Sequence, residues 1–293
     1  HPLTGRVAVN RLWQMCFGNG LVATPEDFGS QGAAPSHPRL LDWLSSEFVT
    51  QGWDVKQFIR TLVCSSTYRQ QSTVPFQVRS LDPDNELYSR GASYQLSAEM
   101  IRDNALAASD LLVTRLGGPS VRPYEVAVSF KPVKQDNGAG LYRRSLYTYW
   151  KRTGPAPTMM ALDASKRDIC VVKRERTSSP VQALVLLNDP QLVEASRVLA
   201  HRLVAGHGED IEGIAVEAFR RLTSRRPSAQ EAELLVQLCR EQREHYSANP
   251  DAAAALLATG QARPVGELPS DQVAAVAMMV NMLMNFDACV MKK

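Results

Sequence analysis

Apolar residues recur at helical spacing along most of the chain, and this pattern predicts a mainly α-helical protein. Over residues 4–17, Val9, Trp13 and Cys16 share one face, and Gly18 is positioned to end the helix. We predict further helices over residues 37–51, 54–66, 97–114, 179–188, 189–206, 210–222 and 228–245, and from residue 270 onward.

Capping signals support several of these limits. Asp54 and Ser97 stand where an N-cap is needed, and Ser228 with Glu231 forms a capping box. The helix over residues 179–188 reads "PVQALVLLN" after its cap and has almost no polar face. We therefore expect it to be buried on most sides.

The middle of the chain lacks a helical period. In "LYRRSLYTYWKR", the side chains of Leu146, Thr148 and Trp150 would point to one side of an extended chain, and those of the residues between them to the other. This alternation predicts a strand. We expect a mainly α multi-helix domain with a small β insert in the middle; an α+β fold is the alternative. The predicted parts are an N-terminal helical part over 1–117, a β/loop insert with a basic stretch over 118–178, and a C-terminal helical part over 179–293. Together they are expected to form one compact domain.

Composition narrows the class of protein. The 293 residues are 44% hydrophobic and 22% charged, and the net charge of +3 does not suggest a nucleic-acid partner. We expect no transmembrane segment, because no apolar run approaches the roughly 20 residues that cross a membrane. The chain begins at His1 without an initiator Met, so we expect it to be part of a longer protein. The absence of a signal peptide from this sequence therefore gives no information on the cellular compartment.

The five cysteines are scattered and form no C-x-x-C pair, and the histidines are equally dispersed. We therefore expect no metal site, haem or other cofactor. Cys16 and Cys239 fall on apolar helix faces and are predicted to be small buried hydrophobes with free thiols that react slowly until the chain unfolds.

The triplet Asp27-Phe28-Gly29 matches the magnesium-binding motif of protein kinases. A kinase also needs a glycine-rich phosphate loop and a catalytic Asp loop upstream, and only 26 residues precede the triplet. The chain contains no P-loop motif either. We conclude that it is neither a kinase nor a P-loop NTPase, and that Phe28 anchors a loop that Gly29 turns.

The densest run of cations lies between residues 143 and 176, where aromatic side chains interleave with them. Arginine forks bind carboxylates, sulfates and phosphates, and flat aromatic faces stack on sugars. The alternative is a solvated surface with local ion pairs. The predicted ligand-binding residues are Arg143, Arg144, Lys151, Arg152, Arg167, Arg174 and Arg176.

Four residues are the candidates for catalysis, namely His37, Asp163, Arg167 and Cys170. Cations near Cys170 would favour its thiolate, but a nucleophile also needs a base and no His is close in sequence. A buried inert thiol and a loop-bound neutral His37 are the structural alternatives. A deep pocket that joins these groups would favour an enzyme.

The segments "LWQMCFGNGLVATPEDFGSQG", "YRRSLYTYWKRT", "RERTSSPVQALVLLNDPQLVEASR" and "MLMNFDACV" resemble blocks of a bacterial domain family of unknown function. The resemblance covers nearly the whole chain. That family forms the C-terminal part of planctomycete proteins, which often carry a cytochrome-c-like domain upstream. The resemblance implies an exported, multidomain parent with an extracytoplasmic location, and it supplies no catalytic residues.

We therefore expect a non-catalytic binding or scaffolding domain whose partners are the other domains of its parent and an anionic polymer such as a polysaccharide. The alternative is a hydrolase or redox-linked enzyme with a site around Asp163, Arg167 and Cys170.

Overall fold

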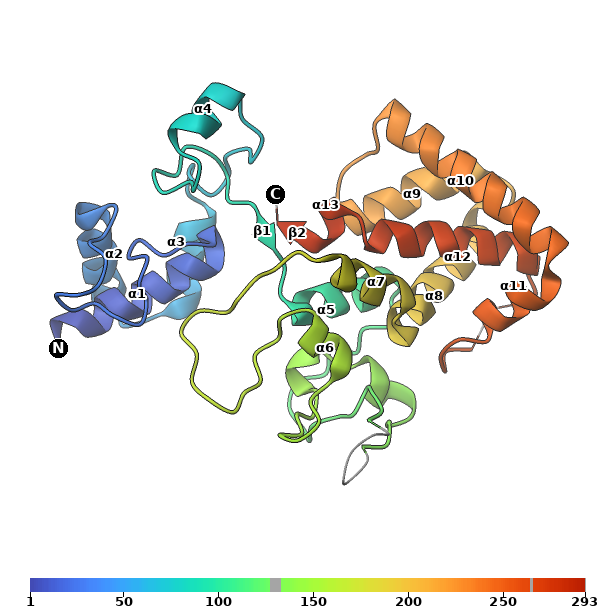
Figure 1. The fold of residues 1–293 in the computed structure, drawn as a ribbon, viewed down its shortest axis with the longest axis horizontal. Helices are drawn as coiled ribbons and strands as arrows, with labels where there is room; N and C mark the ends of the chain where they lie inside the picture. The colour runs from blue at the N-terminus through green and yellow to red at the C-terminus, as the bar shows by residue number, and fades with distance from the viewer. Residues whose placement is uncertain (127–132, 264–265, 293) are drawn as a thin grey trace. The chain divides into compact units, whose positions relative to one another are not determined.

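The computed structural model describes residues 1–126, 133–263 and 266–292, and the chain separates into two units (Figure 1). The first unit contains His1–Tyr94 and Cys170–Glu175 together with the C-terminal residues from Met291. The second unit contains Gln95–Ile169 and Arg176–Val290. The chain thus divides at residue 94, and the residues from 95 to 117 belong with the later helices.

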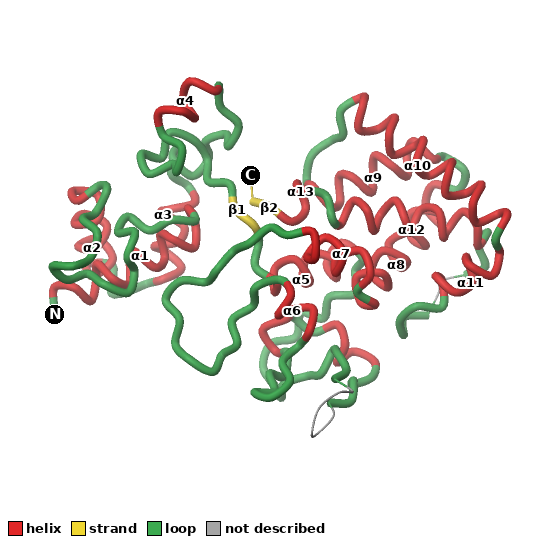
Figure 2. The backbone as a smooth tube through the Cα atoms, in the orientation of Figure 1, coloured by secondary structure: helices red, strands yellow, loops and turns green. Residues whose placement is uncertain are grey.

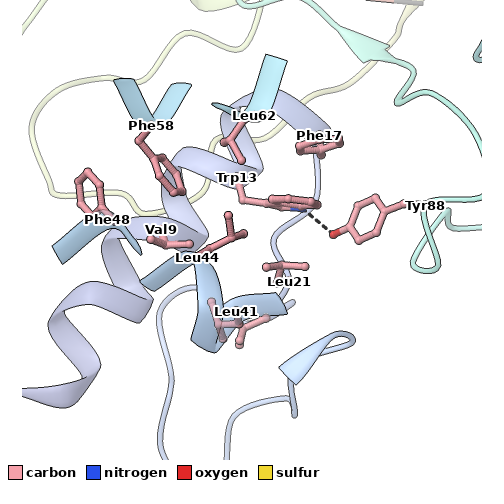
Figure 3. Close-up of a cluster of buried hydrophobic side chains, with 11 residues drawn as sticks. Val9, Trp13, Phe17, Leu21, Leu41, Leu44, Phe48, Phe58, Leu62 and Tyr88 are labelled. Atoms are coloured by element: carbon pink, nitrogen blue, oxygen red, sulfur yellow. Dashed lines mark hydrogen bonds between the residues drawn. The ribbon is translucent and has the colours of Figure 1, made fainter. Parts of the chain in front are cut away.

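The first unit is a small helical body. Its helices are α1 (Pro2–Phe17), α2 (Pro38–Thr50), α3 (Val55–Val63) and α4 (Phe76–Leu81). Figure 3 shows the side chains of α1, α2 and α3 meeting in one apolar cluster around Val9 and Leu44. Within it, the Trp13 indole Nε1 donates to the Tyr88 hydroxyl at 2.8 Å, which satisfies the one polar group that each aromatic residue buries (Figure 3).

The second unit contains most of the regular secondary structure of the described residues (Figure 2). It is built from α-helices with two short 3₁₀ helices between the first two of them. The elements are α5 (Ala98–Ala108), η1 (Gly138–Tyr142), η2 (Ser145–Tyr147), α6 (Pro157–Ala161), α7 (Pro180–Asn188), α8 (Pro190–His207), α9 (Ile211–Thr223), α10 (Ala229–Ala248), α11 (Pro250–Leu257), α12 (Ser270–Met284) and α13 (Asp287–Val290).

The core of the second unit lies along α12 and α8. α12 packs against both α8 and α10 (Figure 1), and Val273, Val276 and Met279 of α12 are fully buried. Small residues on α12 allow this close packing, because Ala274 and Ala275 are also fully buried.

The predicted caps at Asp54, Ser97, Ser179 and Ser228 are confirmed, but Ser36 does not cap α2, whose N-cap is His37. Asp54, Ser97 and Ser179 accept hydrogen bonds from backbone N–H groups in the first turns of α3, α5 and α7. Ser179 and Ser228 each form a complete capping box. The prediction of a mainly α fold is confirmed. The small β element consists of β1 (Tyr94–Gln95) paired with β2 (Met291–Lys292) and of isolated bridges.

The predicted strand around residues 145–150 is wrong. Residues 145–147 form η2, and Thr148 makes a single bridge to Val121. The predicted alternation is absent too, because a strand would place Leu146 and Thr148 on the same face, whereas Thr148 is buried and Leu146 is exposed. The 3₁₀ turn over residues 145–147 breaks the period of two.

The expected burial of α7 on most sides is also wrong. Leu186 is 4% exposed, whereas Val181 and Leu184 are 63% and 61% exposed. A helix without a polar face gives no periodic signal of which side faces inward, so the sequence could not reveal its peripheral position. Among the described residues, no helix is long and apolar enough to cross a membrane.

Leu184 and Leu186 provide a matched test on this helix. Leu186→Ala should lower the free energy of unfolding by about 2–5 kcal/mol, because it empties a packed site. Leu184→Ala should change it by about 0.5 kcal/mol or less, since the side chain faces solvent. Urea unfolding measures both; equal losses would mean that the outer face of α7 is covered in the folded protein.

The cysteines differ in exposure. All five lie among the described residues and are free. Cys239 is buried as predicted, and so is Cys289, whereas Cys16 is only half-buried and Cys64 and Cys170 are exposed. Burial raises the pKa of Cys239 to about 11 and that of Cys289 to about 12, and it also raises the pKa of Cys16.

A raised pKa reduces the reactive thiolate, so a disulfide reagent at pH 8 should modify two thiols quickly and three slowly. Denaturant should make all five react at once. Cys64→Ser and Cys170→Ser together should abolish the fast phase. A fast phase that persists in this double variant would contradict the slow reaction expected of the other three.

Candidate functional site

A cavity of about 390 Å³ lies within the second unit. α5 packs against both α6 and α8 (Figure 1), and these three helices supply much of the wall. Loop residues near 124, 135 and 148 complete it. The lining residues are Ala98, Ile101, Arg102, Pro123, Tyr124, Glu125, Gln135, Thr148, Ala156, Pro157, Thr158, Met159, Leu162, Asp189, Pro190, Gln191 and Leu192.

Asp189 organises one end of the cavity. It begins α8, and its Oδ1 accepts from the backbone N–H groups of Gln191 at 3.0 Å and Leu192 at 3.1 Å. Its Oδ2 accepts from the hydroxyl of Thr158 on α6. One carboxylate therefore both caps α8 and fixes α6 beside it, and Pro190 in the first turn of α8 follows from the same helix-start signal.

Arg102 of α5 is the buried cation of the wall, with 8% of its surface exposed. Its Nε donates to Gln191 Oε1 at 2.5 Å. One terminal nitrogen donates to the Arg143 carbonyl and the Ser145 hydroxyl, and the other donates to the Leu141 carbonyl. All three guanidinium nitrogens are thus engaged within the protein.

Carboxylates balance this charge. Asp103 lies 3.5 Å from the Arg102 guanidinium, and Asp189 also interacts with it electrostatically. Burial lowers the pKa of Arg102 to about 10, and the two carboxylates oppose that shift. Arg102 stays positive at neutral pH, with its charge compensated inside the unit.

Three further polar side chains of the wall are held in place as well. The Gln191 amide Nε2 donates to the Leu141 carbonyl at 2.8 Å, and Gln135 Nε2 donates to the Pro123 carbonyl at 2.9 Å. The Tyr124 hydroxyl donates to the Tyr149 carbonyl. These bonds preform the wall.

The side chain of Thr148 lacks such a bond. It is 4% exposed, and its buried hydroxyl has no hydrogen-bond partner among the described residues. A buried polar group without a partner is unfavourable, and in native proteins it calls for an explanation. Thr148 lies in the wall of the cavity, but its hydroxyl oxygen is covered by neighbouring atoms of the protein.

Arg143, predicted as an anion ligand, has a different place in the structure. It is 2% exposed, and its guanidinium donates to the carbonyl oxygens of Pro119 at 3.0 Å, Arg115 at 3.1 Å and Gly117. The guanidinium also lies 3.8 Å from the centroid of the Tyr147 ring. Arg143 therefore braces the loop over residues 115–119 and does not face solvent.

The other predicted ligands are accessible to different degrees. In the second unit, Arg144, Arg152, Arg167 and Arg176 are exposed and Lys151 is half-buried. Arg144 lies 3.8 Å from Asp103, and Arg167 lies 3.8 Å from Glu99. Arg174 is exposed in the first unit.

The four catalytic candidates are divided between the units. Cys170 and His37 belong to the first; the Nδ1 of His37 lies 3.0 Å from the Ser36 hydroxyl. Asp163 and Arg167 belong to the second.

Asp163 closes a loop in the second unit. Its Oδ2 accepts from the backbone N–H and the hydroxyl of Thr177, both at 2.7 Å, and from Gln182 Nε2 at 3.0 Å. Burial opposes its ionisation, but these hydrogen bonds outweigh burial and lower the pKa of Asp163. These contacts give Asp163 a structural role at the base of the loop that leads to α7.

Sequence reasoning missed the cavity residues Arg102 and Thr148. Asp189 was recognised as a helix start, but nothing in the sequence indicated that it also binds Thr158. The described residues contain no group of three or more His, Cys, Asp or Glu side chains placed to hold a metal ion.

Taken together, the fold and the site define a helical protein with a preformed, mostly apolar cavity. The family model described as PSD1, a protein of unknown function (DUF1553), matches residues 1–239. The chain belongs to this family. Neither a curated protein nor a solved structure matches it significantly.

Adjacent arginines test the role assigned to Arg143. Arg143→Lys should lower the free energy of unfolding by at least about 2 kcal/mol, because an ammonium cannot reach three carbonyl oxygens at once and leaves buried acceptors unpaired. Arg144→Lys, at an exposed position, should cost about 0.5 kcal/mol or less. Thermal and urea unfolding measure both, and equal stability of the two variants would show that Arg143 does not brace the loop.

Proposed function

We propose that this chain is a non-catalytic binding module and that its ligand occupies the cavity of the second unit. The supporting observation is the cavity itself. Small-molecule sites in proteins are preformed hollows of roughly 300–1,000 Å³, mostly apolar, with a few fixed polar groups. This cavity has about 390 Å³, a wall in which nine of the seventeen lining residues are Ala, Ile, Leu, Met or Pro, and polar side chains held by internal hydrogen bonds.

The state of the polar groups favours binding over catalysis. A general acid or base must be free to exchange a proton with a substrate. Asp189 instead caps a helix and accepts from Thr158, and Arg102 donates through all its nitrogens. The groups with which the alternative enzyme hypothesis began, Asp163 and Arg167, are not among the lining residues.

The resemblance in sequence supports a setting for this module. We propose that it forms the C-terminal part of an exported, multidomain planctomycete protein and works beside a cytochrome-c-like domain. In that setting the cavity would serve a larger assembly by holding a ligand for, or a segment of, its other domains.

A larger side chain at position 156 would fill part of the cavity. Ala156 is 2% exposed and precedes Pro157, so Ala156→Leu adds volume inside the wall. Ala34→Leu is the matched control, because Ala34 is exposed and also precedes a proline. In saturation-transfer NMR with a panel of small organic molecules, Ala156→Leu should reduce binding of the hits at least tenfold, and Ala34→Leu should leave it unchanged.

The proposal that the cavity binds the ligand would fail if the hits bound equally to both variants, or if no molecule of the panel bound the wild-type chain. Ala156→Leu should unfold within about 1–3 kcal/mol of wild type, the usual cost of extra volume in a packed region. Urea unfolding checks that a loss of binding is not a loss of fold.

An anionic polymer remains a second candidate ligand, at the surface. The Arg167 guanidinium lies 4.9 Å from the centroid of the Trp150 ring, with the exposed Arg152 nearby in sequence. A cation stacked on an aromatic face in this way suits a sulfated or carboxylated sugar.

Dextran sulfate and neutral dextran distinguish this second function. Dextran sulfate should bind at low salt and weaken clearly at physiological salt, where charges are screened beyond about 8 Å, whereas dextran should show no such trend. Arg152→Glu should weaken binding several-fold. The control is Arg240→Glu, on the exposed face of α10. Equal losses in both variants would mean that only net charge matters, with no site at the basic stretch.

A further inference from the structure

The charged side chains of the cavity wall decide which class of ligand the cavity can hold. Four of the five N–H groups of Arg102 donate to acceptors of the protein itself. A carboxylate or phosphate typically binds a guanidinium through two parallel N–H groups, and Arg102 has only one left. The guanidinium that lines the cavity therefore cannot hold an anion in this bidentate way.

Two carboxylates line the same cavity. Asp189 is already engaged, because it caps α8 and accepts from Thr158. Together with Asp103, which lies outside the lining, it balances the charge of Arg102. Glu125 is exposed, and among the described residues it forms no hydrogen bond or ion pair. The uncompensated charge of the described lining is thus the negative charge of Glu125.

A cation outside the lining, Arg167, acts electrostatically on the Tyr124 hydroxyl. Its guanidinium lies 3.8 Å from the Glu99 carboxylate and 4.9 Å from the centroid of the Trp150 ring. Arg167 therefore has partners of its own, and it does not supply the cavity with a cation for a bound anion.

The rest of the wall is mainly aliphatic carbon, from Ile101, Met159, Leu162 and Leu192 and from alanine and proline residues. An ionised group that enters such a site loses its hydration and needs a partner there. An anion would find no free pair of donors and would be repelled by Glu125. A cation could pair with Glu125 only where water also reaches the carboxylate, and such exposed pairs contribute little.

We infer that the cavity takes an uncharged, mainly apolar molecule, and that Glu125 is the residue that sets its preference against anions. The inference rests on the proposed function, because it assumes that the cavity is the ligand site. It adds the chemical class of the ligand and a residue that determines specificity.

Three probes with the same methylated ring test the class: p-cresol, 4-methylbenzylammonium and p-toluate. At neutral pH they are uncharged, positive and negative. An apolar cavity of about 150 Å³ holds one benzene molecule, so a cavity of about 390 Å³ admits all three by size. Titrations of the full chain by saturation-transfer NMR should give p-cresol an affinity at least about tenfold above that of p-toluate, with the ammonium between them.

Glu125→Gln keeps the shape of the side chain and removes its charge. The affinity for p-toluate should rise about two- to fivefold, the affinity for the ammonium should fall by a similar factor, and that for p-cresol should not change. Glu244→Gln is the control, because it removes the same charge from an exposed position on α10 outside the lining. It should change none of the three affinities.

The outcomes separate the two proposals. If p-toluate binds as tightly as p-cresol, or if the charged probes respond equally to Glu125→Gln and Glu244→Gln, the inference is wrong while the cavity remains a ligand site. If Ala156→Leu weakens the binding of none of the probes, the proposed function fails and the inference fails with it. Binding in the predicted order, with opposite changes for the two charged probes in Glu125→Gln alone, supports both.

Discussion

α8 imposes the constraint on which the second unit depends. Its middle is buried on almost every side, yet it carries Glu194 and Arg197, and buried charges must be paired. Glu194 Oε1 accepts from the Tyr142 hydroxyl at 2.7 Å and from the backbone N–H groups of residues 261 and 262, both at 2.6 Å. Arg197 donates to the carbonyl oxygens of residues 259 and 262. Residues 259–262 are therefore held in place by the two charged side chains of α8. Gly260 is required there, because its φ is +89° and a Cβ would lie 2.2 Å from the Glu194 carboxyl carbon.

The same helix joins this framework to the cavity. α8 begins at the Asp189 cap, whose carboxylate also holds Thr158 of α6, and its first turn supplies Gln191 to the Arg102 network. Each of these groups is engaged in the protein's own hydrogen bonds. A cavity with such a wall is rigid and has few polar contacts to offer, which suits selective binding of a compact, uncharged molecule more than proton transfer or capture of an anion. Thr148 stands out because it lacks such a bond.

Interactions between residues close in sequence could be predicted, whereas interactions between distant segments could not. The caps at Asp54, Ser97, Ser179 and Ser228 depend on residues three positions apart, so a single segment contains the whole interaction. The cavity depends on residues far apart along the chain: Arg102 meets carbonyl groups some 40 positions later, and charge runs read from the sequence cannot separate such a buried arginine from an exposed one. The same limit applies within the basic stretch. Arg143 is buried because it braces a loop, whereas the adjacent Arg144 is exposed. Long blocks of sequence made the family recognisable, and the family model matches residues 1–239, but the family is one of unknown function and supplies no mechanism.

The central claim is that a small uncharged molecule enters the cavity beside the first turn of α8. Methyl NMR of a methionine-labelled chain tests it most directly, because Met159 lies in the wall and is 4% exposed, whereas Met282 is 51% exposed on α12. On titration with p-cresol, the Met159 methyl signal should shift progressively and saturate, and the Met282 signal should stay in place. A saturable shift of Met282 with Met159 unchanged would place the ligand outside the cavity and contradict the account.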